Sequence, residues 1–377
     1  MSDDTLPTVW DAEPHTLAKH GIFRSYLEAW AAILSNASFA ASELLLVDGF
    51  AGPGEYATGE PGSPVVALSA ILDHSRTLPK PVRCVFIEKD VKRHQHLCAR
   101  LARDHARTSA SSRVIVDDPI RGDCEFEIRK LIAKRKADRK PLGPALFFLD
   151  QFGYSQISMS LLKEIMSNGQ CEVFSYLNCQ RLSPYIADST KAAAITDAYG
   201  DESWRAAIAL EGDARQQCLI TTYMEAIRKN AWVEFVWSFA MFDTGAHLLH
   251  WLVFSTNSLS GLENMKKAMW AADKGGTYHF SDRVDPRQQV FFSTLDDEWL
   301  AAELSKQLMG EVLDEDQLKE FVLTRTPFYR YKAVMQLLRK TDRVSSVNQG
   351  QKWPIRFVKA TQPVATVKPK ALSLFDV

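Results

Sequence analysis

Five short apolar runs, each followed by a segment with helical spacing, constrain the fold of this chain more than any other feature. They cover residues 44–48, 82–88, 114–116, 145–150 and 172–177. Runs of this kind predict strands that are buried on both faces, as in a parallel sheet. The segments between them are long enough for helical crossovers. The alternation therefore predicts an α/β fold with helices on both faces of a parallel sheet.

Two further strands follow a mostly helical stretch at residues 189–230. They cover residues 233–242 and 248–255, and only the five residues 243–247 separate them. So short a connection predicts an antiparallel hairpin. Parallel strands that finish in such a hairpin are typical of a class I methyltransferase sheet. We therefore expect a Rossmann-like sheet of this type, with an antiparallel hairpin of its sixth and seventh strands, in residues 41–290, after an N-terminal helical segment at 1–40.

The C-terminal part of the chain has a different pattern. Three helical stretches, at 297–309, 314–323 and 329–340, precede two short strands within 344–358 that are joined by a turn at 348–350. Three helices followed by a β-ribbon predict a small winged helix-turn-helix domain at residues 295–360. Residues 361–377 contain prolines and no periodicity, which predicts a flexible basic tail.

The charge of the chain is concentrated at this end. Residues 325–377 contain eleven Lys and Arg against two acids, although the whole chain has a net charge of −1. A basic end on a nearly neutral protein indicates binding to a polyanion, and the alternative is a solvated basic tail. The candidate nucleic-acid contacts are Arg330, Lys332, Arg339, Lys340, Lys352 and Arg356.

Composition excludes several other classes of protein. No stretch reaches the roughly 20 apolar residues that cross a bilayer. The first fourteen residues are acidic and have no signal-peptide pattern, so we expect a cytoplasmic protein. Six Cys without a CxxC pair argue against a disulfide framework or a structural zinc site, and no metal site is expected.

A glycine-rich loop follows the first apolar run. It reads Asp48-Gly49-Phe50-Ala51-Gly52-Pro53-Gly54, and its glycines allow the backbone to approach a ligand closely. Glu88 ends the second run at the position where carboxylates accept ribose hydroxyls in Rossmann sites. Asp123 follows the third run, where an acid can read an adenine. The candidate ligand-binding residues are Asp48, Gly49, Phe50, Gly52, Gly54, Glu88 and Asp123.

The cofactor expected for this site is S-adenosyl-L-methionine. Carboxyl ends of parallel strands share one edge of the sheet, so the three acids should converge on one crevice. The dinucleotide fingerprint Gly-x-Gly-x-x-Gly is absent from the sequence, which leaves NAD as the second choice. The structural alternative for each acid is a surface residue that ends a strand.

The candidate acceptor site follows the fourth run. Asp150 comes directly after it, and Phe152 and Tyr154 are aromatic residues of the same turn. In amino-methyltransferases such a turn holds an exocyclic amine with the acid and stacks a flipped base on the aromatic ring. Capping of the strand by Asp150, with the aromatics in the core, is the alternative. A nucleophilic role for Cys179 has little support, because no acid-base partner is visible near it.

The chain as a whole resembles the bacterial three-Cys-motif partner family. The resemblance rests on these residues: His15-Thr16-x-x-Lys19 before Trp30, Asp48 to Gly54 with Gly62-Ser63-Pro64, Phe86-Ile87-Glu88, Asp150-x-Phe152-Gly153, and Met269-Trp270 with Asp273. It implies a methyltransferase-like domain with a methyl-donor site, a winged-helix C-terminal domain and a metal-cluster partner protein. The turn after the fourth strand usually reads Asp-Pro-Phe-Gly in this family, and here Gln151 replaces the proline.

The sequence thus predicts a methyltransferase that uses S-adenosylmethionine and acts on DNA or RNA. The alternatives are a non-catalytic DNA-binding regulator or scaffold that senses a nucleotide, and an NAD-type enzyme. The C-terminal Ala-Leu-Ser-Leu-Phe resembles the peptides that bind the bacterial sliding clamp, which suggests a further partner; the alternative is that this segment folds back onto an apolar patch of its own domain. The apolar residues of this segment are Leu372, Leu374 and Phe375.

Overall fold

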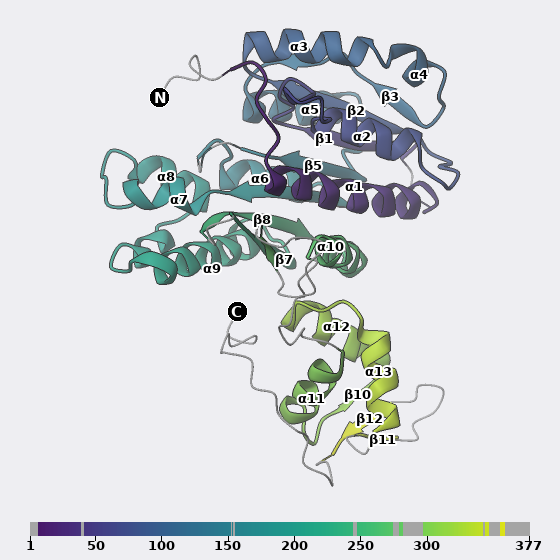
Figure 1. Ribbon diagram of the computed structural model, residues 1–377, viewed down its shortest axis with the longest axis vertical. Helices are drawn as coiled ribbons and strands as arrows, with labels where there is room; N and C mark the ends of the chain where they lie inside the picture. Colours follow the sequence, from purple (N-terminus) through teal and green to yellow (C-terminus); the bar gives the residue numbers. More distant parts are fainter. Residues whose placement is uncertain are drawn as a thin grey trace. The chain divides into compact units, whose positions relative to one another are not determined.

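The computed structural model describes residues 7–38, 41–151, 153, 155–243, 247–273, 279–281, 297–341, 344–346 and 355–358. The chain divides into two compact units. Unit 1 comprises Met1–Ala268 with Phe280–Arg283, and unit 2 comprises Met269–His279 with Val284–Val377. Figure 1 shows the elements of both units, coloured along the chain.

Unit 1 is a mixed α/β unit around a mostly parallel sheet. The strands lie in the order β3-β2-β1-β5-β6-β8-β7-β9, and the short β4 pairs with β2. Strands β3, β2, β1, β5 and β6 are parallel, whereas β8 is antiparallel to both β6 and β7. The bounds are β1 Leu44–Asp48, β2 Val82–Glu88, β3 Val114–Val116, β4 Ile120–Arg121, β5 Ala145–Leu149, β6 Cys171–Leu177, β7 Phe235–Phe242, β8 Leu248–Thr256 and β9 His279–Ser281.

Helices cover both faces of this sheet (Figure 1). On one face, α1 packs against α2 and β1, and on the other, α5 and α9 lie on either side of α6. The helices are α1 Pro14–Ser35, α2 Ser63–Leu72, α3 Val91–Ala102, α4 His105–Ser109, α5 Cys124–Ala137, α6 Met159–Met166, α7 Cys179–Leu182, α8 Ala192–Tyr199, α9 Gly212–Asn230 and α10 Leu259–Ala272, with 3₁₀ turns at Ser183–Tyr185 and Ser203–Ala207.

Alternate side chains of each strand enter different cores, because successive residues of a strand point to opposite faces. Val47 belongs to the core under α5, α6 and α9. Phe148 points to the α1 side and stacks on Phe23, with ring centroids 4.3 Å apart and an interplanar angle of 20°. Burial of a phenylalanine contributes about 1.5–3 kcal/mol, so both layers stabilise the sheet. The continuous burial of β1 and β5 explains why their sequences are apolar throughout.

The expected parallel sheet and its antiparallel hairpin are both present in the described residues. The helical segment expected between the second and third apolar runs is two helices, α3 and α4. Five helices and strands were not expected from the sequence: β4, the one-turn α7, α10, β9 and, in unit 2, β10 (Val312–Leu313). Four of these are too short to create a periodic pattern, whereas α10 begins after Ser258, whose hydroxyl accepts the N–H of Gly261 at 3.1 Å, a cap signal that the sequence contains. None of the described helices is long and apolar enough to cross a membrane.

Unit 2 has its own core and a small antiparallel sheet. The elements follow one another as α11 (Asp297–Gln307), β10, α12 (Glu315–Arg325), α13 (Tyr331–Lys340), β11 (Val344–Ser346) and β12 (Ile355–Phe357). The strands lie in the order β10-β12-β11. Asp314 and Gln317 form a capping box that begins α12. The core includes Leu300, Leu318, Phe328, Val334 and Ile355. The predicted turn at 348–350 lies outside the described residues.

Candidate functional site

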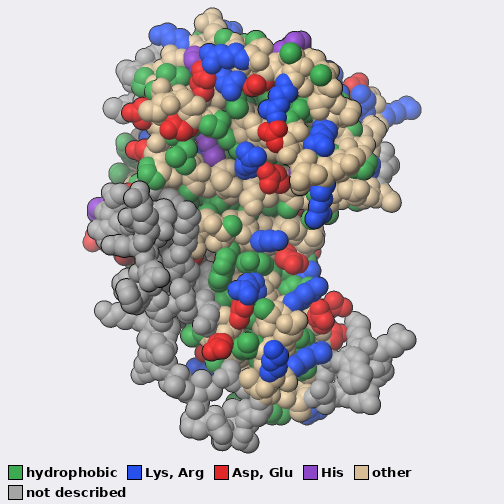
Figure 2. Space-filling model, turned by 45° about the vertical axis from the view of Figure 1, so that its right-hand side comes forward, with side chains coloured by type: hydrophobic (Ala, Val, Ile, Leu, Met, Phe, Trp, Pro, Cys, Tyr) green, Lys and Arg blue, Asp and Glu red, His purple; other side chains and the backbone are tan. Residues whose placement is uncertain are grey.

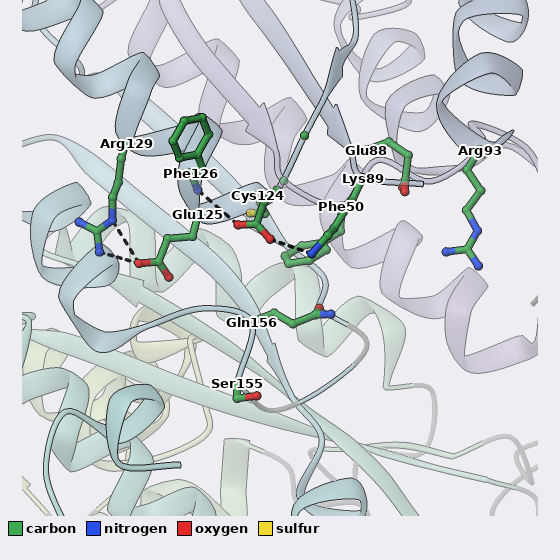
Figure 3. A pocket seen from close by; sticks show the side chains of 13 residues that line it. Phe50, Glu88, Lys89, Arg93, Cys124, Glu125, Phe126, Arg129, Ser155 and Gln156 are labelled. Atoms are coloured by element: carbon green, nitrogen blue, oxygen red, sulfur yellow. Dashed lines mark hydrogen bonds and ion pairs between the residues drawn. The ribbon is translucent and has the colours of Figure 1, made fainter. Parts of the chain in front are cut away.

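A cavity of about 520 Å³ opens where the parallel strands of unit 1 end. Ligands of open α/β sheets bind at this edge, outside the carboxyl ends of the strands. In Figure 3, Phe50 and Gln156 lie between Glu88 on one side and the Glu125–Arg129 pair on the other. The lining residues are Gly49, Phe50, Glu88, Lys89, Arg93, Gly122, Asp123, Cys124, Glu125, Phe126, Arg129, Ser155 and Gln156.

The glycine loop after β1 lines this cavity at Gly49 and Phe50, and its residues 51–54 line a smaller neighbouring cavity. A Cβ at Gly49 would lie 2.4 Å from Sγ of Cys124 and 2.9 Å from Cδ2 of Leu149, so only glycine fits between β1 and α5. Gly52 and Gly54 have φ angles of 61° and 85°, which side chains rarely adopt. The loop therefore takes a close-packed course that depends on these three positions.

Asp48 is a fully buried carboxylate at the start of this loop. Its Oδ1 accepts the backbone N–H of Phe50 at 3.2 Å, and its Oδ2 has no hydrogen-bond partner among the described residues. Burial raises the pKa of Asp48 from 3.8 to about 7, and the negative charges of Asp150 and Glu88 also act to raise it. The nearby hydroxyl of Ser63 acts in the opposite direction and lowers the pKa. A buried carboxyl with an unused oxygen is suited to a cationic or N–H-bearing ligand.

Glu88 ends β2 and lines the same cavity. Its Oε2 accepts the N–H of Gly52 at 2.9 Å, and its Oε1 accepts the N–H of Asp90 at 2.7 Å. Burial raises the pKa of Glu88, while the two backbone N–H groups and Arg93 oppose that shift. Each carboxylate oxygen has a second lone pair for a ligand hydroxyl. Glu88 thus joins the glycine loop to the end of β2 and still faces the cavity.

Asp123 is the third acid at this edge, and it also caps a helix. Its side chain accepts the N–H of Phe126 at the start of α5 and pairs with Lys89 at 3.2 Å. Its side chain is half exposed, unlike those of Asp48 and Glu88. The Phe126 ring beside it is exposed and lines the cavity, so an aromatic face is available at this rim.

Asp150 follows β5 and lies on the other side of the glycine loop. Together with Trp10, Tyr56 and Ser63 it lines a narrow cavity of about 30 Å³ beside the larger one. Its Oδ2 accepts a hydrogen bond from Nζ of Lys19 in α1, which is 131 residues away in the sequence. The structure therefore brings the predicted acceptor residue close to the predicted donor residues. Phe152 and Tyr154, the other two acceptor candidates, lie outside the described residues.

Gln151 has a structural function that the sequence analysis did not predict. Its buried amide donates to the Tyr176 carbonyl at 3.0 Å and accepts the N–H of Gln156 at 3.0 Å. These bonds tie the turn after β5 to β6 on one side and to its own later residues on the other. The side chain of Gln151 thus links residue 151 to Tyr176 of β6 and to Gln156.

A column of side chains lies beside Asp150. Lys19 stands over the Tyr176 ring, with Nζ 5.1 Å from the centroid, and the ring of His250 stacks on Tyr176 at 4.0 Å. His15 approaches His250 edge-on at 5.6 Å. The sequence analysis named His15 and Lys19 only through the family resemblance and did not connect Tyr176 or His250 with the site.

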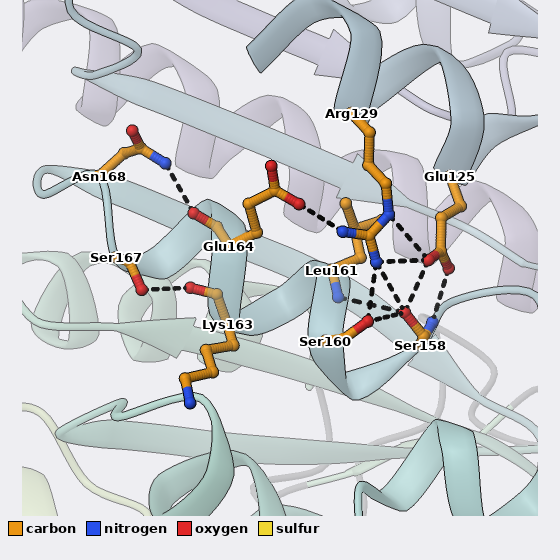
Figure 4. Close-up of polar contacts among 9 residues, drawn as sticks. All are labelled: Glu125, Arg129, Ser158, Ser160, Leu161, Lys163, Glu164, Ser167 and Asn168. Atoms are coloured by element: carbon orange, nitrogen blue, oxygen red, sulfur yellow. Dashed lines mark hydrogen bonds and ion pairs between the residues drawn. The ribbon is translucent and has the colours of Figure 1, made fainter. Parts of the chain in front are cut away.

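The loop between Asp150 and α6 is held by a polar network (Figure 4). Glu125 accepts the backbone N–H of Ser158 at 3.0 Å and its hydroxyl at 2.8 Å. Arg129 binds Glu125 at 2.6 Å, donates to Ser160 at 2.7 Å and pairs with Glu164. Hydrogen bonds from Arg129 and Ser158 hold the pKa of Glu125 below its usual value in spite of burial. The network fixes one wall of the large cavity.

Cys179 begins α7 and is fully buried. Burial raises the pKa of its thiol, so the thiolate that nucleophilic catalysis needs is disfavoured. This environment agrees with the low weight that the sequence analysis gave to a covalent mechanism.

The predicted nucleic-acid residues of unit 2 lie in different environments. Lys332, Arg339 and Lys340 are exposed on α13, and Arg356 is exposed on β12. Arg330 is the N-cap residue of α13 and pairs with Asp297 at 3.0 Å. The lower part of Figure 2, which is unit 2, shows Lys and Arg side chains with Asp and Glu among them. Lys352 lies outside the described residues.

Comparison with known proteins identifies no family for this chain. No family model and no curated protein matches it. Two solved structures show weak similarity, each with a TM-score of 0.30. A DUF574 family protein from Streptomyces avermitilis is 8% identical over 63% of this chain and 83% of that chain. A possible exported protein from Bordetella parapertussis is 13% identical over 66% and 71%, respectively. Similarity at this level carries no conclusion about activity.

Proposed function

We propose that this chain is a methyltransferase that uses S-adenosylmethionine and modifies a nucleic acid. The observation that carries the proposal is the order of the sheet, in which β8 runs antiparallel between β6 and β7 at the end of five parallel strands. This arrangement is typical of class I methyltransferases. The acid-lined cavity at the carboxyl edge of the same strands supports it further.

The residues around the cavity fit such a donor. Its volume of about 520 Å³ is within the usual range for a small-molecule site. Asp48 does not line the cavity, but it directly precedes the lining residue Gly49, and its unused buried oxygen would hold a cationic amino group; Glu88 would accept ribose hydroxyls. Phe126 would lie against the adenine, and Asp123 is beside it. When bound, the donor supplies a methyl group on a positively charged sulfur.

The contribution of the chain to catalysis would be positioning and electrostatics. The Asp150 carboxylate would accept a hydrogen bond from the acceptor and orient it toward the donor. Asp48 and Glu88 make the donor side of the site negative when both are ionised, which favours a cationic donor over its neutral product, whereas the charge of Asp150 is offset by Lys19. The Gln151 bonds and the Arg129–Glu125 pair would hold Gln151, Gln156 and Ser158 in place before the substrate arrives.

Calorimetric titration tests the donor site directly. We expect S-adenosylhomocysteine to bind the full chain, and NAD and ATP to bind much more weakly. Heat with NAD alone would favour the NAD-type enzyme, and absence of heat with S-adenosylhomocysteine on a folded sample would refute the donor site. Transfer of radiolabelled methyl groups to mixed DNA, tRNA and rRNA then identifies the polymer.

Asp150→Ala separates the two halves of the site. If Asp150 orients the acceptor, this variant loses methyl transfer and keeps the wild-type dissociation constant for S-adenosylhomocysteine. A loss of donor binding would instead assign Asp150 to the donor site or to the stability of the fold.

We propose further that unit 2 is a winged-helix module that binds the nucleic acid. Its order of elements, helix, strand, two helices and two strands, supports this, as does α13, which contains no acid and exposes Lys332, Arg339 and Lys340. Removal of residues 295–377 should flatten the dependence of affinity on salt, since log affinity falls by about 0.9 per phosphate contacted. An unchanged slope would show that unit 2 makes no phosphate contacts.

Two partners remain proposals from the sequence: a three-Cys-motif metal-cluster protein and the bacterial sliding clamp. The clamp-binding residues, Leu372, Leu374 and Phe375, lie outside the described residues. A fluorescent peptide of residues 366–377 should bind purified clamp in the micromolar range and lose binding in Leu374→Ala and Phe375→Ala. No binding at tens of micromolar would exclude the clamp as a partner of this segment.

A further inference from the structure

The acids at the edge of the sheet are close enough to influence one another. The charges of Asp150 and Glu88 raise the pKa of Asp48, after the larger effect of its burial. Asp150 is the third carboxylate at this edge, and its charge would make the acceptor side strongly negative unless a cation offset it. Lys19 supplies that cation, because its ammonium group hydrogen-bonds directly to Asp150.

Lys19 is held in this position by the fold. Its side chain is only 9% exposed, and its Nζ lies between the Asp150 carboxylate and the face of Tyr176. Tyr176 is in turn fixed by the stacked ring of His250. A lysine with this little exposure does not sample the many positions of a surface lysine, so the pair with Asp150 is a constant part of the site.

The histidine stacked beside Lys19 and Tyr176, His250, does not add positive charge. Burial, and then the charges of Lys19 and His15, hold the pKa of His250 well below its usual value, so its imidazole is neutral at pH 7. The Nε2 atom of His250 is buried and has no partner among the described residues. Lys19, Asp150 and His250 therefore contribute an ion pair and a neutral ring to the acceptor side.

We propose that Lys19 determines which acceptor the site binds. Because Lys19 neutralises Asp150, the site selects an uncharged N–H group, such as the exocyclic amine of a nucleobase. Lys19 takes Oδ2 of Asp150, and Oδ1 makes no hydrogen bond within the described residues. That oxygen can accept one N–H. A protonated amine would meet the ammonium group of Lys19, and an anionic acceptor would meet the carboxylate.

This inference rests on the proposed function, and donor analogues test it without a known acceptor. Sinefungin carries a protonated amine where the donor has its methyl-bearing sulfur, and S-adenosylhomocysteine has a neutral sulfur there. The ratio of their dissociation constants therefore reports the charge near Asp150. In Lys19→Met the unpaired carboxylate should favour sinefungin by about tenfold relative to wild type, the effect of one charge-assisted hydrogen bond.

Matched variants complete the experiment. Lys19→Arg keeps the charge and should keep the wild-type ratio, and Asp150→Asn should shift the ratio against sinefungin. Lys134→Met removes an exposed lysine of α5 and should change nothing. Because both analogues are measured on the same variant, a general loosening of the fold cancels in the ratio.

An unchanged ratio in Lys19→Met, with both analogues still bound, would overturn the inference while the donor site stands. If Lys19→Met does not fold, an unchanged ratio in Asp150→Asn overturns it equally. If neither analogue binds the wild-type chain, the donor site is refuted, and the inference falls with it.

Discussion

Replacing Asp48 by Asn should stabilise the protein at alkaline pH and abolish donor binding. Asp48 is fully buried and one of its oxygens has no partner among the described residues, so its ionised form is poorly solvated. Its pKa is raised from 3.8 to about 7. At 1.36 kcal/mol per pH unit, the ionised carboxylate costs about 4 kcal/mol above pH 7.

The sign of the effect follows from the direction of the shift. A carboxyl whose pKa is higher in the folded than in the unfolded chain favours folding while it is protonated, and that contribution is lost as the pH rises from about 4 through 7. An amide cannot ionise, so Asp48→Asn avoids the loss. The NH₂ group of the new amide needs hydrogen-bond acceptors at this buried position. This requirement reduces the expected gain in the free energy of unfolding at pH 8 to about 2–4 kcal/mol.

Thermal unfolding at pH 5 and pH 8 measures this difference. A gain of this size raises the Tm of a domain as large as unit 1 by about 5–10 °C at pH 8, and the gain should shrink at pH 5. Asp123→Asn is the matched control, because this acid is half exposed and Asn also caps helices well. If Asp48→Asn has a lower Tm than wild type at pH 8, or the same difference at both pH values, the reasoning from burial is wrong.

Three further predictions concern other parts of the molecule. Glu88→Ala should weaken S-adenosylmethionine binding by about 1.5–3 kcal/mol, the value of hydrogen bonds to a charged group; an unaltered calorimetric dissociation constant would remove Glu88 from the donor site. Gly49→Ala should lower stability by about 1–3 kcal/mol, because the new Cβ would lie 2.4 Å from Sγ of Cys124. Gly21→Ala, in open space on α1, should be neutral or stabilising in the same denaturation assay. Lys332→Ala should reduce the salt slope of DNA binding by about 0.9, and an identical slope would show that Lys332 contacts no phosphate.

The sequence by itself determined the longer strands of the sheet and the position of the acids at its carboxyl edge. Runs such as 44–48 and 145–149 are apolar because both faces of a central strand are buried, so a local pattern is enough to identify them. The convergence of Asp48 and Glu88 also followed, since the carboxyl ends of parallel strands share one edge. The short connection at 243–247 fixed the pairing of β7 with β8 in the same local way.

Only the tertiary structure decided the acceptor side. Lys19 and Asp150 are 131 residues apart in the sequence. Tyr176 and His250 stack because β6 and β8, on which they lie, pair with each other. Gln151, which looked like a departure from the family turn, is a buried bridge between that turn and β6. Such contacts depend on how helices and strands pack across the fold. Hydrophobic periodicity records which face of an element is buried, and it contains no information about which distant side chain the fold brings against it.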